Sequence, residues 1–294
     1  MALFKGTATA LITPFRNEKI DYPAMGRLVE WQLKNGVDAL VVCGTTGEAS
    51  TLSGKERVQL THFVVDLVKG RVTVIAGTGS NNTKFTTELS MEMESIGADG
   101  LLVVTPYYNK CTESGMISHY EKIADHVEIP MILYSVKSRT GVNISPGVVR
   151  VLSDHPKIAG IKEASGDMSQ ICEMAAYIGD HFSIYSGNDD MTVPIMALGG
   201  MGCISTVSNI IPKQYAQMTH DYLEGNISRA AMDQIRLKPL IDAIFAEVNP
   251  IPLKAALNIM GMCDLEYRLP LCPPTNKTQY LLYNVLREYG LVQK

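Results

Sequence analysis

Short apolar runs recur along the chain at intervals of about 25 to 30 residues. Each run is rich in β-branched or aliphatic residues and is bounded by Gly, Pro or Asn, which is typical of β-strands. The runs that we interpret as strands cover residues 7–13, 39–43, 72–76, 101–105, 131–135, 158–162, 182–186 and 202–206.

Amphipathic segments separate these runs. Residues 22–36 and 54–68 place apolar side chains three and four positions apart, which is the helical period. Strands that alternate with helices predict a parallel sheet, and eight such units close into a (β/α)8 TIM barrel of the α/β class. An open doubly wound sheet is the competing fold, but the first strand is not followed by a dinucleotide-binding fingerprint.

The chain continues well beyond the eighth strand. Residues 228–248, 250–262 and 278–290 read as further helices, separated by Pro250, Pro252 and a Cys-Pro-Pro-Thr turn. We therefore predict a catalytic barrel over residues 1–224 and a C-terminal helical domain over residues 225–294.

Composition narrows the classes of function. The chain of 294 residues is 46% hydrophobic and 19% charged, and its formal net charge is −4. This balance gives no reason to expect nucleic acid or an anionic membrane as a partner. No targeting segment or run of about 18 apolar residues is present, so we expect a cytoplasmic protein without a membrane span.

Cysteine and histidine spacing gives no sign of a metal site. The six cysteines are scattered without a CxxC pair, and the six histidines form neither HxH nor HExxH. We expect reduced cysteines that are mostly packed as small apolar residues, and we expect no bound metal.

In a barrel of this kind the active site lies at the C-terminal ends of the strands. These ends carry hydroxyls, glycines and one lysine, without a histidine or a cluster of carboxylates. Such a set disfavours metal-dependent hydrolysis and two-carboxylate glycoside hydrolysis, and it favours covalent catalysis by an amine. The strand-end residues are Gly44–Glu48, Gly77–Gly79, Thr105–Asn109, Tyr134, Lys162, Gly187–Asn188 and Ser205.

Lys162 is the candidate nucleophile. Alternation along its strand predicts that Ile158, Gly160 and Lys162 share one face, which would aim the amine into the barrel above a glycine. Burial disfavours the charged form of an amine and so exposes a nucleophile. The alternative is a structural lysine paired with Glu163. Tyr134 likewise reads either as a packed aromatic or as a proton carrier.

Five motifs resemble one enzyme family in their order and spacing: GTTGE (44–48), TPYYNK (105–110), SRTG (138–141), GIKEASGD (160–167) and NPIPLK (249–254). The family is that of the 4-hydroxy-tetrahydrodipicolinate (dihydrodipicolinate) synthases, and the resemblance runs from about residue 4 to the end. This family belongs to a superfamily of pyruvate-dependent class I lyases that includes N-acetylneuraminate lyase. The resemblance implies a TIM barrel, a C-terminal helical domain and a lyase of lysine and diaminopimelate biosynthesis.

The resemblance also implies catalytic roles. Lys162 would form a Schiff base with pyruvate, whose methyl carbon then adds to L-aspartate-4-semialdehyde. Tyr134, Tyr108 and Thr45 would relay protons, with Tyr108 completing the site of a neighbouring subunit. A homotetramer built as a dimer of dimers, and no cofactor, are implied.

Substrate-binding roles follow in the same way. Thr46 and the backbone at Gly187 and Ile204 would hold the pyruvate carboxylate and the imine, and Arg139 would bind the carboxylate of the semialdehyde. A sister lyase acting on a sugar acid or another 2-keto acid is the alternative. Arg139 argues against it, because sialate-type relatives carry a non-basic residue there.

The sequence departs from the family pattern in two regions. Ser135, Lys137 and Cys111 replace the usual Asn, Pro and Pro, which we expect to affect loop rigidity and substrate affinity more than the chemistry. Lysine-sensitive relatives bind free lysine with a carboxylate and histidines where this chain has Phe85, Gly54 and Arg57. We therefore expect that free lysine does not inhibit.

Overall fold

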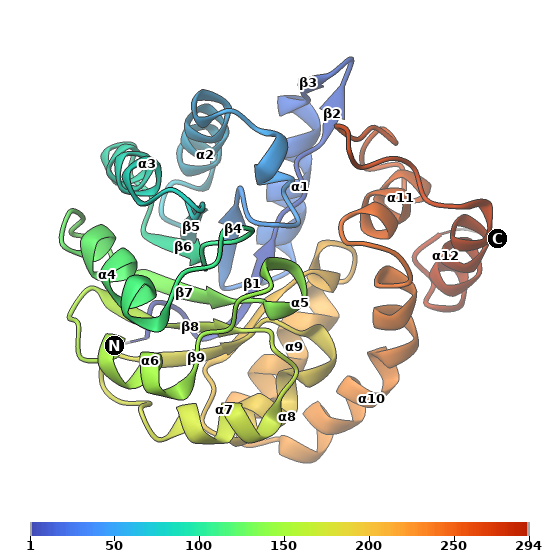
Figure 1. Cartoon of the computed structure of the whole chain (residues 1–294). Coiled ribbons are helices and arrows are strands. Elements are labelled where there is room, and N and C mark those ends of the chain that lie inside the picture. The colour runs from blue at the N-terminus through green and yellow to red at the C-terminus, as the bar shows by residue number, and fades with distance from the viewer. Residues whose placement is uncertain (1, 293–294) are drawn as a thin grey trace.

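The computed structural model describes residues 2–292 as a closed barrel of parallel strands surrounded by helices (Figure 1). Neighbouring strands follow the order β1-β10-β9-β8-β7-β6-β5-β4 around the barrel, and the prediction of a TIM barrel is confirmed. The barrel strands are β1 (Gly6–Ala10), β4 (Ala39–Val42), β5 (Thr73–Gly77), β6 (Gly100–Val104), β7 (Met131–Ser135), β8 (Ile158–Glu163), β9 (Ser183–Ser186) and β10 (Gly202–Ser205). A small hairpin of β2 (Phe15–Arg16) and β3 (Lys19–Ile20) follows β1.

Helices cover the outside of the barrel, and several of them begin at a residue whose side chain caps the helix. Ser53 and Glu56 form a reciprocal capping box at α2, and Asp21 caps α1. Within residues 2–292 no helix combines the length and hydropathy needed to cross a bilayer. The barrel helices are α1 (Tyr22–Lys34), α2 (Gly54–Val68), α3 (Thr83–Ser95), α4 (Glu113–Ala124), α5 (Lys137–Thr140), α6 (Pro146–Leu152), α7 (Met168–Ala175), α8 (Thr192–Ala197) and α9 (Pro212–Leu223), with short 3₁₀ turns at Ala49–Thr51, Asp189–Met191 and Val207–Asn209.

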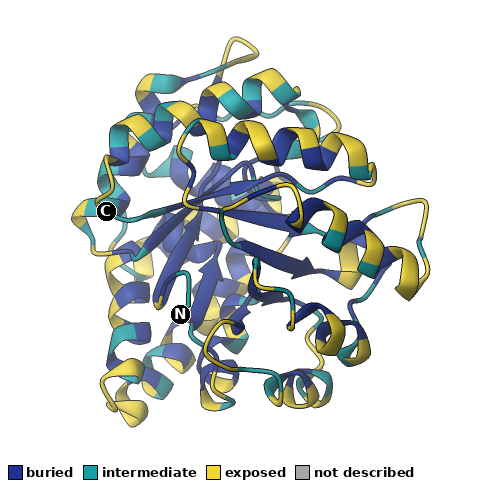
Figure 2. Cartoon of the chain, turned by 90° about the vertical axis from the view of Figure 1, so that its left-hand side faces the viewer, coloured by how far each residue is buried: buried dark blue, intermediate teal, exposed yellow. Residues whose placement is uncertain are grey.

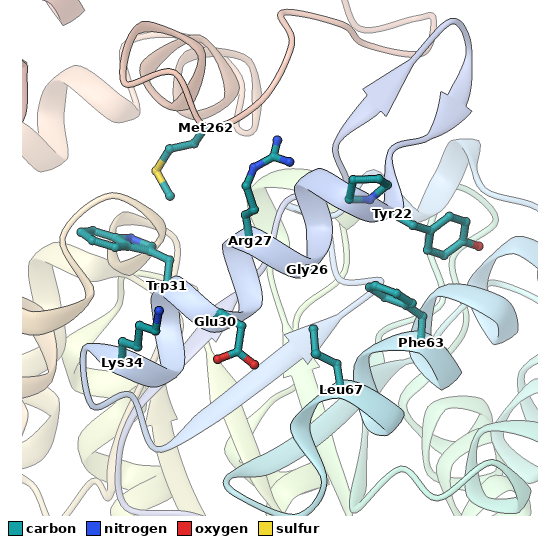
Figure 3. A pocket seen from close by; sticks show the side chains of 10 residues that line it. Tyr22, Gly26, Arg27, Glu30, Trp31, Lys34, Phe63, Leu67 and Met262 are labelled. Atoms are coloured by element: carbon teal, nitrogen blue, oxygen red, sulfur yellow. The ribbon is translucent and has the colours of Figure 1, made fainter.

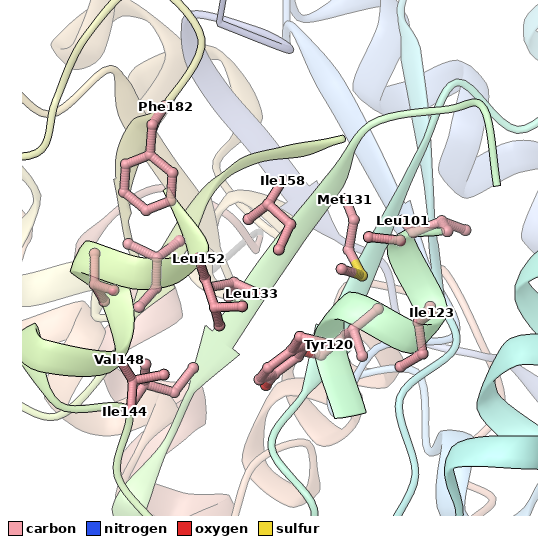
Figure 4. Packing of buried hydrophobic residues seen from close by; sticks show 14 of the residues in the cluster. Leu101, Tyr120, Ile123, Met131, Leu133, Ile144, Val148, Leu152, Ile158 and Phe182 are labelled. Atoms are coloured by element: carbon pink, nitrogen blue, oxygen red, sulfur yellow. The ribbon is translucent and has the colours of Figure 1, made fainter. Parts of the chain in front are cut away.

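The strands are buried on both faces, which explains why they appear in the sequence as continuous apolar runs (Figure 2). One face fills the barrel with side chains such as Ile75, Ile132 and Ile204. The other packs against the helices, where Leu133 meets residues such as Tyr120 in the cluster drawn in Figure 4. The barrel interior is therefore a packed core that leaves space for chemistry only near its rim.

The strand that carries Lys162 contains a β-bulge. Met131 of β7 pairs with Ile158, but Ile132 pairs with Gly160, so β8 holds one extra residue at Ala159. Ile158 consequently packs outward among the helix-facing residues, while Gly160 pairs with inward-facing Ile132. The prediction that Ile158 shares the face of Lys162 is wrong, because strict alternation does not allow for an inserted residue.

Three helices follow the barrel: α10 (Ile227–Ile244), α11 (Ile251–Ile259) and α12 (Asn276–Glu288). Their apolar faces share one cluster with barrel residues, including Leu240 and Leu253 with Ile12 and Val207. The C-terminal helical part is therefore confirmed. The chain turns between α9 and α10 at residues 224–226, and a domain boundary between 224 and 225 stays a prediction.

A buried ion pair ties this helical part to the rim of the barrel. Lys254 Nζ in α11 lies 2.6 Å from Glu48 Oε1 in the loop after β4, and both side chains are fully buried. The amine also lies 4.3 Å from the ring centre of Phe15, and the backbone amide of Arg268 donates to the second carboxylate oxygen of Glu48. Each charge is compensated only by partners that the folded chain brings together.

Removing one charge of this pair should be costly, because the other charge would stay buried alone. We expect Lys254→Met to lower the free energy of unfolding by about 3–5 kcal/mol. The double variant Glu48→Leu/Lys254→Met should recover most of that loss, since no uncompensated charge remains. Denaturant unfolding of the two variants and the wild type measures the difference, and additive losses would contradict this account.

Candidate active site

A cavity of about 670 Å³ opens at the C-terminal ends of β4 to β7, where a TIM barrel carries its active site. Four of the predicted site residues line it, and the structure thus brings these four together. They are Thr45, Tyr108, Tyr134 and Arg139.

Lys162 lies beside this cavity in the barrel interior. The residue is 6% exposed, and its Nζ lies 4.3 Å from the ring centre of Tyr134. Tyr134 and Tyr185 are its direct partners on the two neighbouring strands. A Cβ on Gly187 would lie 3.2 Å from Lys162 Cε, so Gly187 is the glycine that leaves room for this side chain.

Glu163 points away from Lys162, and the structure therefore rules out their pairing. Its carboxylate accepts hydrogen bonds from the backbone and hydroxyl of Ser165 and from Gln170 Nε2. Burial raises the pKa of Glu163. Gln170 also bonds Asn143, which in turn accepts from Ser135 Oγ. These polar contacts link the outer face of β8, the strand of Lys162, to the segment that carries Arg139. No sequence pattern predicted them.

The turn after β4 presents unused donors. Within the described chain the amides of Thr45 and Thr46 donate to no protein acceptor, while those of the next two residues close the turn. Thr46 is buried, and its hydroxyl accepts from Asn249 Nδ2 at 3.0 Å and lies 3.4 Å from that of Thr206. Adjacent free amides in a turn form an anion-binding concavity.

Gly187 and Ile204 are placed differently from each other. The amide of Gly187 donates to the carbonyl of Glu163 at 2.7 Å, so only its carbonyl oxygen remains to accept a hydrogen bond from a ligand. Ile204 is buried inside the barrel in register with Ala8. Neither lies among the residues that line the cavity.

Arg139 sits on α5, a single turn that Gly141 closes in the left-handed conformation. Its Nη2 donates to the backbone carbonyl of Asn249 at 3.3 Å. Ser135 accepts a hydrogen bond from the amide of Ile144, and Thr140 bonds the backbone at both ends of the turn. The loop without the family's proline is thus held by hydroxyl groups.

The other two departures lie in different surroundings. Lys137 is exposed and lines the cavity, while Cys111 packs beside the outer core. Their effect on substrate affinity stays a prediction.

Tyr107 and Tyr108 follow β6, and they differ in exposure, since Tyr107 is half-buried and Tyr108 is exposed. Tyr108 is 90% exposed and has a backbone φ of 68°, a left-handed conformation that bulky residues seldom adopt. The carbonyl of Tyr107 accepts from Asn81 Nδ2. Strain of this kind persists where the surroundings impose it and is common at functional sites.

Arg57 reaches the same cavity from α2. Its guanidinium donates to the carbonyl of Ala49, and burial lowers its pKa. Phe85 packs near Gly54 in the neighbouring groove between α2 and α3. These positions place a cation and a phenyl ring where lysine-sensitive relatives differ, and insensitivity to lysine stays a prediction.

Asp189 is a site residue that the sequence did not reveal. It is buried after β9, accepts from Ser205 Oγ at 2.5 Å and from the amides of Thr206 and Val207, and has a pKa raised by burial. It fixes the end of β10 next to Thr46. Within residues 2–292 no three His, Cys, Asp or Glu side chains gather in a way that could hold a metal ion.

A larger hollow, of about 770 Å³, lies on the outside of the barrel along α1 and α2 (Figure 3). Trp31, Phe63 and Leu67 line it, with Met262 at its edge. It lies away from the strand ends and contains none of the predicted site residues, so we assign the chemistry to the smaller cavity.

Comparisons with known proteins agree on the family of this chain. The model of the dihydrodipicolinate synthetase family matches residues 3–289. The 4-hydroxy-tetrahydrodipicolinate synthase of Thermoanaerobacter sp. (strain X514) is 49% identical, over 100% of this chain and 99% of that protein. The 4-hydroxy-tetrahydrodipicolinate synthase 1 of Clostridium acetobutylicum is 47% identical over 100% of both.

Solved structures agree as well. The dihydrodipicolinate synthase of Thermotoga maritima superposes with a TM-score of 0.97 at 44% identity, covering 99% of this chain and 100% of that chain. The resemblance noted from the five motifs is thereby confirmed. The chain belongs to the dihydrodipicolinate synthetase family.

Proposed function

We propose that this chain is a lyase that condenses pyruvate with L-aspartate-4-semialdehyde to 4-hydroxy-tetrahydrodipicolinate through a Schiff base on Lys162. The observation that carries the proposal is the buried amine beside Tyr134, at the edge of a cavity rich in hydroxyls. The curated relatives named 4-hydroxy-tetrahydrodipicolinate synthase support the choice of substrates.

The reaction proceeds through an imine, an enamine, a new carbon–carbon bond and closure of a ring. The Lys162 amine adds to the ketone carbon of pyruvate, and loss of water gives the imine. The imine nitrogen takes up a proton, and loss of a methyl proton from this iminium gives a neutral enamine. The enamine carbon attacks the aldehyde of the second substrate, whose oxygen takes up a proton. The amino group of that substrate then displaces Lys162 and closes the ring.

Proton transfer in these steps falls to hydroxyl groups. Tyr134 lies against Lys162, and Thr45 lines the adjoining cavity, which supports a relay through these two hydroxyl groups. Tyr108 would complete the relay in the site of a neighbouring subunit. A positioned hydroxyl can pass a proton over hydrogen-bond distances. We assign the relay to Tyr134, Thr45 and Tyr108.

The two carboxylates are bound by different donors. The free amides of Thr45 and Thr46 and the hydroxyl of Thr46 are suited to the pyruvate carboxylate. The carbonyl of Gly187 can accept from the N–H of the protonated imine, and the backbone at Ile204 would help to hold the bound pyruvate. Arg139 offers a planar bidentate donor to the carboxylate of the semialdehyde.

The exposed Tyr108 supports a shared site between subunits. Tyr108 is 90% exposed, so a neighbouring subunit could bury its apolar ring and use its hydroxyl. We propose a homotetramer, arranged as a dimer of dimers, in the cytoplasm. A solved structure described as the first monomeric dihydrodipicolinate synthase variant, 44% identical with a TM-score of 0.97, is a reason to test assembly directly.

Replacing the nucleophile tests the chemistry. Incubation with pyruvate and borohydride, followed by peptide mass mapping, should give one adduct on Lys162 in the wild type. Lys162→Ala and Lys162→Arg should reduce it below detection without loss of the native circular dichroism, because neither offers a reactive amine. Lys137→Ala, which removes another lysine at the cavity, is the matched control and should keep the adduct. An adduct on a different lysine would sink the assignment.

Arg139→Ala should separate the two substrates. Loss of a charge-assisted contact costs about 1.5–3 kcal/mol, so kcat/KM for the semialdehyde should fall about 10- to 150-fold. Pyruvate trapping should stay within about twofold of the wild type, since Arg139 does not touch that subsite. Steady-state kinetics and adduct yield measure the two effects, and an equal loss of both would show that Arg139 organises the whole site.

Tyr108→Phe should leave the association state unchanged and lower turnover by about 100-fold or more, because one proton carrier is lost. Sedimentation velocity should show a tetramer for both proteins. Mixed oligomers of Tyr108→Phe and Lys162→Ala should regain part of the activity if Tyr108 serves a neighbour. A fully active monomer would refute the shared site.

A further inference from the structure

The segment Asn249–Lys254 belongs to the C-terminal helical part, yet it meets both substrate subsites proposed above. Asn249 is 6% exposed and contacts two of the proposed binding residues. Its side-chain Nδ2 donates to Thr46 Oγ1 at 3.0 Å, and its backbone carbonyl accepts from Arg139 Nη2 at 3.3 Å. One residue thus bridges the proposed pyruvate subsite and the proposed semialdehyde subsite.

The direction of the side-chain hydrogen bond has a chemical consequence. Because Asn249 Nδ2 is a donor, Thr46 Oγ1 accepts from it and keeps its own hydrogen available. The other neighbour of Thr46 Oγ1 is the hydroxyl of Thr206, at the longer distance of 3.4 Å. The Thr46 hydroxyl is therefore prepared to donate to an anion seated on the free amides of Thr45 and Thr46.

We propose that Asn249 is a positioning residue that sets Thr46 as a hydrogen-bond donor to the carboxylate of pyruvate, while its backbone anchors Arg139. This inference rests on the proposed function, since it needs pyruvate at Thr46. The buried ion pair of Lys254 with Glu48 holds both ends of the arrangement, because Lys254 follows Asn249 in the same segment and Glu48 follows Thr46 in the same turn.

The side chain and the backbone of Asn249 can be tested separately. Asn249→Asp is nearly isosteric but replaces the donor by an ionised acceptor. It would draw the Thr46 hydrogen toward itself and repel the pyruvate carboxylate. Asn249→Ala removes the donor without adding a charge. Neither change alters the backbone carbonyl that accepts from Arg139.

The experiment measures the pyruvate concentration that gives half-maximal borohydride trapping on Lys162, together with KM for the semialdehyde. Near pH 8 we expect Asn249→Asp to raise the half-saturating pyruvate concentration by about 10-fold or more, and Asn249→Ala by about 2- to 10-fold. KM for the semialdehyde should change by less than about twofold in either variant, because the anchor of Arg139 is retained. Asn258→Asp is the matched control, since its Nδ2 bonds the carbonyl of Cys263 within the helical part. It should match the wild type.

A pH series distinguishes positioning from a merely structural role. A carboxyl group has an ordinary pKa of about 3.9, and burial raises it, so the new side chain of Asn249→Asp regains a donor hydrogen as the pH falls. The ratio of its half-saturating pyruvate concentration to that of the wild type should therefore shrink from about pH 8 toward about pH 5.5. Equal defects in Asn249→Asp and Asn249→Ala that do not change with pH would overturn the proposal.

Two further outcomes are decisive. If the wild type traps pyruvate and Asn249→Asp traps it equally well, the role of Asn249 is refuted while the proposed function stands. If the wild type forms no adduct, the proposed function fails and this role fails with it. Should Asn249→Asp not fold, as thermal melting would show, Asn249→Ala decides the matter: an unchanged half-saturating concentration refutes the proposal, and a selective loss of pyruvate affinity supports it.

Discussion

The buried pair of Glu48 and Lys254 is the interaction on which the geometry of the cavity depends. Its partners are 206 positions apart in the sequence and 2.6 Å apart in space, with no exposure to solvent. Burial lowers the pKa of Lys254, and the nearby carboxylate of Glu48 opposes that shift. Because each charge would be costly without the other, the turn after β4 and the start of α11 must come together for either to be buried.

That constraint explains why the C-terminal helical part is needed to shape the candidate active site. A TIM barrel needs only its own helices to close its core, yet here α11 delivers Lys254 to the turn that contains Thr45 and Thr46. Arg268 adds to the same contact, donating to the carbonyl of Thr51 and to Glu56. Residues of the C-terminal helical part thus stabilise the turn after β4, where the proposed pyruvate subsite lies.

Much of this could be predicted from the sequence, for reasons that are local. Apolar runs and helical spacing depend on burial of each element, so the barrel followed from them. Lys162 was found because a charged residue at the end of an apolar strand is costly unless it has a purpose. The pairing of Asn249 with Thr46, and the polar chain from Glu163 through Gln170 to Asn143, were not predictable. They arise when distant segments meet, and an Asn or a Gln in the sequence carries no sign of its partner.

The bulge at Ala159 has a consequence for how such a strand can change. Ile158 and Lys162 are four positions apart and would face the same side in a regular strand, but here the first serves the outer core and the second faces the lumen. The extra residue separates the start of β8, which packs against the helices, from the part of β8 that carries Lys162 and faces the barrel interior. We therefore expect that substitutions among the helix-facing residues around Ile158 leave the direction of the Lys162 side chain unchanged. Substitutions near Lys162 that suit a new substrate should likewise leave the packing of the helices unchanged.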